Sequence, residues 1–467
     1  MPLILGTNSI KDTGYNVANS CRFEAAYLKR TVTASTSNTW TLSFWLKKSG
    51  HNGSSEGYLF SYGSDGGQGL YISAAGYIGY YGASGYTSDS TLSSGVLKDP
   101  SAWYHILFSV SSGTGTLYIN GVQDAQISNV APLNATNGTA YGVNSYINYE
   151  DNFDNFLGYL TEYVFIDGTA YNQNSFGEFD EDSPTIWKPI DVSGLTFGTN
   201  GFYLDFEDSS DLGKDVSGNG NDFTATRLAA TDQSIDTCTN NFATFNPLIT
   251  FPANPSDLSE GNLKVETIDQ DPGQFGGAST IGVSQGKWYF ESTSLSSREL
   301  VTAGGGSITH AVGIHSNPAE AARQGTSFAP QFTGGFIYAL TGKYYSTGTG
   351  SSGASYGSTF AHNDIIGVAV DLDNHKLYFS KNGTFQNSGD PTSGSTGTGA
   401  ISITTGLTYF AFVADIGGSA NTSSINFGSP INSISSGNAD ANGFGNFEYA
   451  VPSGYFSLCT KNLAEFG

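Results

Sequence analysis

Charge is scarce in this sequence, and positive charge is scarcest. Asp, Glu, Lys and Arg make up 13% of the 467 residues, about half the usual share of a soluble domain. The 18 Lys and Arg face 41 Asp and Glu, so the net charge is −23. Proteins that bind nucleic acid need basic patches to displace counterions from phosphates, which excludes that class of partner. The same negative field disfavours anionic membrane surfaces.

Cysteine and long apolar runs are also scarce. The three cysteines, Cys21, Cys238 and Cys459, are odd in number and far apart. This excludes the dense disulfide framework of small secreted domains, and we expect buried free thiols. No segment approaches the ~20 apolar residues of a membrane span, so we expect no membrane insertion. Met1–Gly14 lacks a basic region before its short apolar run, and we expect no export signal there.

Neither the histidines nor a phosphate-binding motif indicates a metal or nucleotide site. The six histidines are scattered, and none pairs with another at the short spacing of a metal site. We expect His105, which lies in an apolar strand pattern, to have a hydrogen-bonded structural role. A G-x-x-x-x-G-K-[ST] loop is absent from the sequence, so a nucleotide site of that type is excluded.

Glycine and aromatic residues are abundant instead. The chain has 61 Gly, 27 Tyr and 31 Phe. Glycine favours tight turns, whereas Tyr, Phe, Thr and Val favour strands. Short alternating runs separated by Gly, Asn and Ser recur, as in Trp40–Leu46, Trp103–Val110 and Ile365–Asp371. The sequence therefore predicts an all-β fold with very little helix.

Two hairpins share one design. Asn120-Gly121 and Asn382-Gly383 each follow a strand that contains Leu-Tyr, and Asn-Gly accepts the positive φ values of a tight hairpin turn. The same unit about 260 residues apart indicates two related sandwiches. We place an N-terminal arm at 1–19, a first sandwich at 20–230, a linker at 231–260, a second sandwich at 261–430 and a C-terminal tail at 431–467.

Each half resembles a known family. In the first half, the carrying segments are Arg22–Thr31, Trp40–Trp45, Trp103–His105 with Tyr118–Gly121, and Gly158–Gly168. Together they resemble the laminin-G-like, concanavalin-type lectin fold. In the second half they are Gly286–Glu291, Ala311–Ile314, Asp364–Asp373, Leu377–Gly383 and Ile425–Gly428. This set resembles a SPRY domain. The resemblances imply two tandem concanavalin-like jelly-roll β-sandwiches.

The order of the two halves is similar to that in virion structural proteins of aquatic bacteriophages. That resemblance implies a tail fibre, spike or capsid-decoration protein, made in the host cytoplasm and extracellular after lysis. Its partners would be other virion proteins, further copies of itself, with a trimer preferred, and a host surface glycan or protein. The alternatives are a glycan-active enzyme or a secreted bacterial lectin of the same fold. A third is a SPRY-type adaptor.

Glycoside hydrolysis needs two carboxylates that flank the sugar. Asp205 and Glu207 have suitable spacing on one strand, but no Trp-rich cleft is evident around them, and we interpret them as loop carboxylates. We therefore expect no catalytic residue and no enzyme activity.

Tyrosines and acidic loops contain the candidate ligand-binding residues. Tyr80, Tyr81 and Tyr86 are candidates for stacking on sugar rings. Calcium prefers several oxygen ligands from flexible loops. Asp151 and Asp154 are the candidates for such a site, and Glu178–Asp182 is a second acidic loop. We expect no cofactor, with calcium left open.

Overall fold

The computed structural model describes most of the chain. The described residues are 12–32, 37–49, 57–63, 68–82, 90–133, 140–143, 156–249, 257–267, 274–295, 310–319, 333–415 and 421–467. Of these residues, 43% lie in strands and 7% in helices. This confirms the predicted all-β fold class. None of the helices in the described ranges is long and apolar enough to cross a membrane.

The described residues form two compact units, 12–241 and 242–467. The division falls between Asn241 and Phe242, inside the segment that we expected to be a linker. Gln233 and Ser234 pair with the first strand of the first unit. Phe245 is fully buried in the core of the second unit. The segment 231–249 is therefore shared between the two units.

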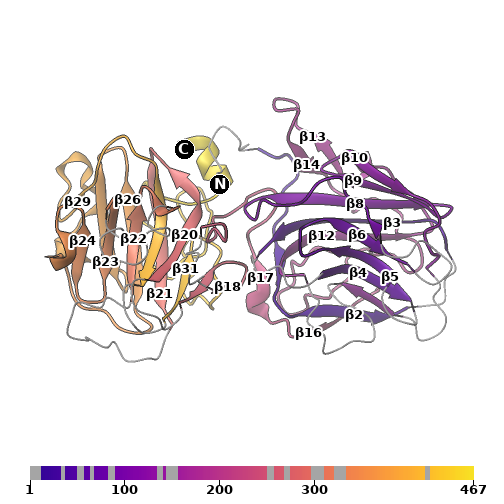
Figure 1. Cartoon of the computed structure of the whole chain (residues 1–467), viewed down its shortest axis with the longest axis horizontal. Helices are drawn as coiled ribbons and strands as arrows, with labels where there is room; N and C mark the ends of the chain where they lie inside the picture. The colour runs from indigo at the N-terminus through magenta and orange to yellow at the C-terminus, as the bar shows by residue number, and fades with distance from the viewer. Residues whose placement is uncertain are drawn as a thin grey trace. The chain divides into compact units, whose positions relative to one another are not determined.

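The first unit is a sandwich of two antiparallel sheets (Figure 1). In the described residues, the larger sheet has the order β10 (Val122–Ile127), β9 (Thr114–Ile119), β8 (Trp103–Ser111), β3 (Trp40–Lys48), β12 (Gly158–Asp167), β1 (Ser20–Phe23) and β17 (Gln233–Ser234), with β15 (Phe202–Leu204) paired to β12. The smaller has the order β16 (Thr224–Thr226), β2 (Tyr27–Thr31), β11 (Ala140–Val143), β4 (Gly57–Gly63), β5 (Gln68–Ile72), β6 (Ile78–Tyr81) and β7 (Ser90–Thr91). A separate hairpin joins β13 (Gly177–Phe179) to β14 (Trp187–Pro189). Short helices lie before this hairpin, at η2 (Gln173–Ser175), and after it, at η3 (Ala230–Asp232).

Trp40 lies at the centre of the first core. Its side chain is fully buried, and its ring centroid lies 5.8 Å from that of Tyr62 and 5.5 Å from that of Phe108. Tyr62 comes from β4 and Phe108 from β8, so the contacts join the two sheets. Alternate residues of β3 point to this core, as the sequence pattern predicts.

The second unit repeats the two-sheet plan. Among its described strands, the larger sheet has the order β18 (Asp257–Ser259), β19 (Lys264–Glu266), β31 (Thr422–Asn426), β21 (Lys287–Ser294), β26 (Ile365–Asp371), β27 (Lys376–Lys381) and β28 (Thr384–Phe385); β29 (Ile401–Ser402) pairs with β27 and β32 (Phe456–Ser457) with β21. The smaller has the order β20 (Gln274–Val283), β30 (Tyr409–Asp415), β22 (Ala311–His315), β23 (Gly335–Ala339), β24 (Lys343–Ser346) and β25 (Ala354–Ser355). Helical turns occur at η4 (Gly350–Ser352), η5 (Gln386–Ser388), η6 (Pro391–Thr396) and α3 (Thr460–Phe466).

The two predicted hairpins are confirmed, and their local geometry agrees in detail. Asn120 and Gly121 have φ values of 48° and 75°, and Asn382 and Gly383 have 47° and 78°. Each asparagine side chain accepts a hydrogen bond from a backbone N–H of the preceding strand, from His105 at 2.8 Å and from Ile365 at 2.9 Å. One supersecondary unit is therefore built twice.

The segment from 431, which we expected to be a tail, packs on the outer face of the larger sheet of the second unit. Phe447 and Tyr455 are fully buried and form a cluster with Tyr289 and Tyr378. Glu291, on the same sheet face, accepts hydrogen bonds from the backbone N–H groups of residues 448 and 449 at 3.0 and 2.9 Å. This segment is thus an integral cover of the sheet rather than an appendage.

Candidate functional site

The three candidate sugar-binding tyrosines differ in their exposure and in whether the structure describes them. Tyr80 is fully buried in β6, so our prediction for this residue is corrected. Its hydroxyl lies 2.9 Å from that of Tyr62 and accepts a hydrogen bond from the Ala131 N–H at 3.2 Å. The ring is therefore enclosed in the core and is not exposed to a sugar. Tyr81 is 39% exposed at the end of the same strand. Tyr86 lies outside the described residues.

The calcium candidates Asp151 and Asp154 also lie outside the described residues. In the second acidic loop, the Asp180 carboxylate accepts the Ser183 N–H at 2.9 Å and lies 3.4 Å from the Lys188 ammonium. Within the described ranges, no three His, Cys, Asp or Glu side chains gather as metal ligands. Calcium binding stays a prediction.

The carboxyl group that the sequence reasoning missed is Glu162. It lies in β12, where the pairing with β3 shifts register between Thr161 and Val164. A register shift of this kind is a β-bulge, and bulges redirect a side chain. Glu162 has a φ of 48°, which only a firmly held non-glycine residue adopts. The one signal in the sequence is an acidic residue in the interior of a mostly apolar strand.

Glu162 is closed off by tyrosines. Its side chain is buried, and the Tyr203 hydroxyl lies 2.9 Å from both carboxyl oxygens. The Tyr15 hydroxyl lies 3.4 Å from that of Tyr203. Burial is the main cause that raises the pKa of Glu162 to about 8; the nearby charges of Asp205 and Glu207 act in the same direction, and the hydrogen bond from Tyr203 opposes them. At neutral pH this acid therefore keeps its proton.

A protonated carboxyl at neutral pH is the form that a general acid needs. Here, however, both oxygens are engaged by one tyrosine, and the group is only 6% exposed. Asp205 and Glu207 do not complete a pair on one strand face, because Asp205 accepts the backbone N–H of Glu207 at 3.0 Å in a turn. The arrangement links the N-terminal segment to β12 through the hydroxyl groups of Tyr15 and Tyr203.

That segment is fastened at further points. The Val17 N–H donates to the Thr239 hydroxyl at 3.1 Å, and this hydroxyl donates to the Val17 carbonyl at 3.2 Å. The Thr161 hydroxyl donates to the Asn19 carbonyl at 2.6 Å. The described part of the predicted arm, Asp12–Asn19, is therefore bound to the first unit.

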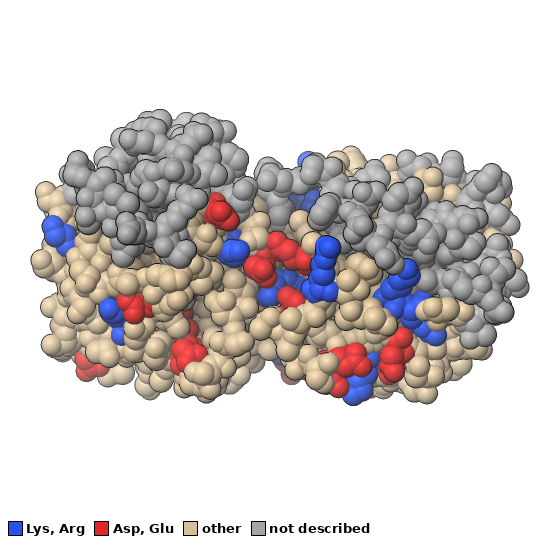
Figure 2. Space-filling model, turned by 90° about the horizontal axis from the view of Figure 1, so that it is seen from below, with Lys and Arg blue, Asp and Glu red and all other residues tan. Residues whose placement is uncertain are grey.

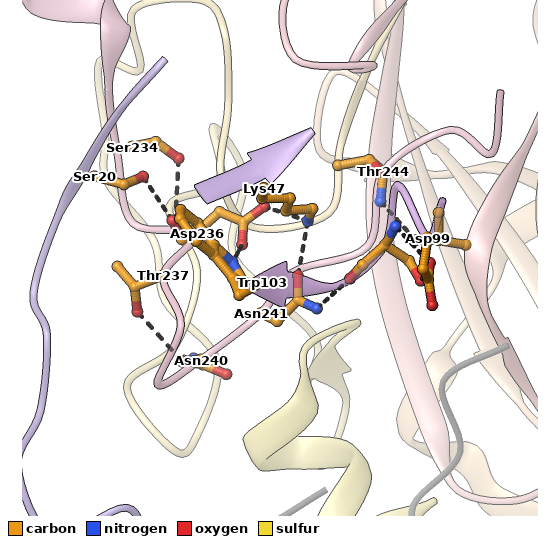
Figure 3. Close-up of polar contacts among 12 residues, drawn as sticks. Ser20, Lys47, Asp99, Trp103, Ser234, Asp236, Thr237, Asn240, Asn241 and Thr244 are labelled. Atoms are coloured by element: carbon orange, nitrogen blue, oxygen red, sulfur yellow. Dashed lines mark hydrogen bonds and ion pairs between the residues drawn. The ribbon is translucent and has the colours of Figure 1, made fainter. Parts of the chain in front are cut away.

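A second buried polar cluster surrounds Asp236 (Figure 3). The Lys47 ammonium lies 2.7 Å from one Asp236 carboxylate oxygen, and both side chains are 1% exposed. The indole N–H of Trp103 donates to the other oxygen at 3.1 Å. Lys47 also donates to Asn241, whose amide donates to the Ser101 carbonyl. This cluster ties the end of the first unit to its larger sheet.

His105 has the structural role that the sequence predicts. The indole N–H of Trp187 donates to its Nδ1 at 3.1 Å, so its Nε2–H donates to the Ser43 hydroxyl at 2.8 Å. Burial lowers the pKa of His105 to about 3, and the ring is neutral. The tryptophans Trp45, Trp103 and Trp187 meet here in one buried cluster, so these three rings are not exposed to a ligand.

The comparisons with known proteins fit this geometry. Residues 24–173 match the laminin-G-type family described as the concanavalin A-like lectin/glucanases superfamily. The matched residues lie within the first unit and make up about a third of the chain. The comparison with curated proteins gave no match.

Three solved structures are similar at a low level. A Bacteroides ovatus ATCC 8483 protein, provisionally classed as carbohydrate binding, is 15% identical with a TM-score of 0.33, over 46% of this chain and 61% of that one. The SPRY domain of human HERC1 is 15% identical with a TM-score of 0.28, over 39% and 96%. The heptameric SAP-like pentraxin of Limulus polyphemus is 14% identical with a TM-score of 0.28, over 34% and 80%. Similarity at this level assigns no ligand and no activity.

We predict that Glu162→Gln removes a pH dependence from the stability of the first unit. The folded-state pKa of about 8 lies above that of the unfolded carboxyl, so folding binds the proton more tightly. The stabilising effect of the proton is complete below pH ~4.3 and is lost, at up to about 1.4 kcal/mol per pH unit, as the pH rises toward 8. Urea unfolding at a series of pH values measures this slope. Glu181→Gln, at an exposed carboxylate of the first unit that does not contribute to the shift, is the control. Parallel curves for wild type and Glu162→Gln would contradict the prediction.

We predict that Lys47→Ala lowers the free energy of unfolding of the first unit by about 3–5 kcal/mol, because it leaves the Asp236 charge buried without its partner. Lys48→Ala, the next residue of β3, is the matched control and should cost far less. Calorimetry separates the two. The double variant K47M/D236N should recover part of the loss, since it removes both charges. Equal effects of Lys47→Ala and Lys48→Ala would show that the ion pair is not required.

Proposed function

We propose that this protein is a non-enzymatic adhesive protein that binds neutral glycan and is displayed on a bacteriophage particle. The observation that supports a non-catalytic role is that the Glu162 carboxyl group is buried and hydrogen-bonded to Tyr203. In a fold that lectins and glucanases share, the one strongly buried acid of β12 faces Tyr203 instead of a cleft. An acid held in this way supports a binding role rather than bond cleavage.

The charge distribution supports a neutral ligand. Figure 2 shows Lys and Arg beside Asp and Glu in small mixed groups on the face in view, and most of the described surface there is uncharged. A polyanion would meet a chain of net charge −23 and would be repelled. Neutral sugars carry no such penalty.

The virion setting rests on the order of the two modules, which resembles that of aquatic phage proteins. A particle-bound homo-oligomer, with a trimer preferred, would present several copies to one cell surface. Linked sites raise avidity by orders of magnitude without any new contact. The preferred attachment to other virion proteins is through the N-terminal arm, and the sequence from 431 is the weaker candidate because it is built into the second unit.

The alternative is a glycan-active enzyme, and the raised pKa of Glu162 is the observation in its favour. A secreted lectin would share the binding role but not the particle.

We predict that the purified chain binds polysaccharide from its host surface and releases no reducing sugar from it. Binding is measured on immobilised polysaccharide, and release by a reducing-end assay. Glu162→Gln and Asp205→Asn should bind as the wild type does. Release of reducing sugar by the wild type, abolished in Glu162→Gln, would establish the enzyme instead.

We predict that the protein is found in purified phage particles by mass spectrometry, and that deletion of residues 1–11 removes it from them. This deletion spares Tyr15 and Val17, so the contacts of the segment with the first unit stay intact. Normal unfolding of the truncated protein is the control. Assembly of the truncated protein into particles would place the anchor elsewhere, and its absence from wild-type particles would refute the virion role.

A further inference from the structure

The second unit contains a cleft at the open side of its sandwich. One wall is the edge of the smaller sheet, from β23, β24 and β25, and the other is β29 of the larger sheet, with the turn at η5. Figure 1 shows β23, β24 and β29 together at the left end of the second unit. The volume of about 620 Å³ lies in the range of small-molecule sites, roughly 300–1,000 Å³.

We attribute the cleft to the pair formed by Phe336 and Ser346 on neighbouring strands. Phe336 of β23 lies opposite Ser346 of β24, and Tyr338 lies opposite Tyr344. All four side chains share the inner face of the sheet, because they alternate along their strands. Tyr338 fills the core against Phe379, with ring centroids 5.2 Å apart. The small side chain of Ser346 does not fill the corresponding space near the edge, and β29 is only two residues long.

Aromatic rings form one side of this space. Phe336 and Tyr344 are half-buried, and Tyr356 is buried behind them. The rings of Tyr344 and Tyr356 meet edge to face, with centroids 6.1 Å apart, which holds the Tyr344 ring in position. Among the described residues, the structure gives the Tyr344 hydroxyl no hydrogen-bond partner. A ligand in the cleft therefore meets an aromatic surface and an available hydroxyl group.

The rim of the cleft is polar but uncharged. Ser355, Asn387, Ser402 and Thr404 are exposed around the opening. No Asp, Glu, Lys, Arg or His lines the cleft among the described residues. Lys376 is not a lining residue, and its ammonium donates to the hydroxyl of Ser402, which lines the cleft, at 3.3 Å. The lining thus offers hydroxyl and amide groups of both donor and acceptor type.

This chemistry selects one class of ligand. An anion would find no cation in the lining, and a metal or amine would find no carboxylate. A wholly apolar ligand would leave the rim hydroxyls without hydrogen bonds, which costs free energy. A sugar has a C–H face for an aromatic ring and hydroxyl groups around it. We propose that this cleft is a binding site for a short neutral saccharide, with Tyr344 as the stacking residue. That the ligand is a glycan rests on the proposed function; the site itself is additional to it.

The test uses the full chain and an array of neutral and sulfated oligosaccharides. The strongest neutral binder is then titrated by calorimetry against three variants. Tyr344→Ala removes the stacking ring, and Thr404→Trp adds bulk from the exposed rim. Tyr81→Ala removes the exposed candidate tyrosine of the first unit and tests that residue as the rival site. We expect both cleft variants to lose affinity at least tenfold, Tyr81→Ala to keep it, and all variants to unfold at the wild-type temperature.

Other outcomes separate this inference from the proposed function. If the wild type binds neutral saccharide and both folded cleft variants bind it equally well, the cleft is not the site, although the adhesive role stands. Loss of binding in Tyr81→Ala alone would place the site in the first unit. A preference of the wild type for sulfated sugars, or binding to no sugar of the array, would overturn the cleft site.

Discussion

The constraint on which both units depend is that the larger sheet of each sandwich is apolar on both faces. One face packs on the smaller sheet, and the other must be covered by chain that forms few strands. In the first unit, Phe176, Val192 and Phe197 cover Leu107 and Val164. In the second, residues 447 and 455 cover the tyrosines of β21 and β27. Burial of apolar surface, at about 25 cal/mol per Å², makes these covers part of the fold.

The polar groups buried under the covers follow from the same constraint. A carboxyl group on the outer face of a central strand loses its water when the cover closes, so it needs hydrogen bonds from the covering segment. Glu162 finds them in Tyr203, and Glu291 finds them in two backbone N–H groups. The two hairpin glycines touch the covers too, since a Cβ at Gly121 would lie 2.2 Å from the Trp187 ring and one at Gly383 would lie 2.5 Å from that of Tyr449. The hydrogen bonds of Glu162 and Glu291 thus take part in closing the outer face of each larger sheet.

The sequence predicts elements that have a periodic residue pattern, and it does not predict segments whose contacts have no such pattern. Strands and Asn-Gly hairpins were readable because alternation and turn chemistry are local. The covering segments have no such local pattern, because their contacts are irregularly spaced along the chain. For this reason the sequence predicts a tail from 431. Tyr80 was misjudged for a related reason: Ile78 and Tyr80 alternate inward together, and a tyrosine pair at a strand end does not show by itself which ring is buried. Glu162 was missed because a bulge is a tertiary feature.

Covering both faces of the larger sheets also bears on where a ligand can be held. The open side of the second sandwich, by contrast, ends in a two-residue strand opposite a serine, and there hydroxyl groups and an aromatic ring meet solvent. A neutral cleft of this kind gains no long-range attraction and binds through contacts alone, and such contacts first have to offset the entropy of association. Modest affinity at one site is therefore the physical expectation. For the proposed adhesive role, firm attachment would then come from several copies of the chain on one particle. Linked sites bind together with a much higher avidity than a single site.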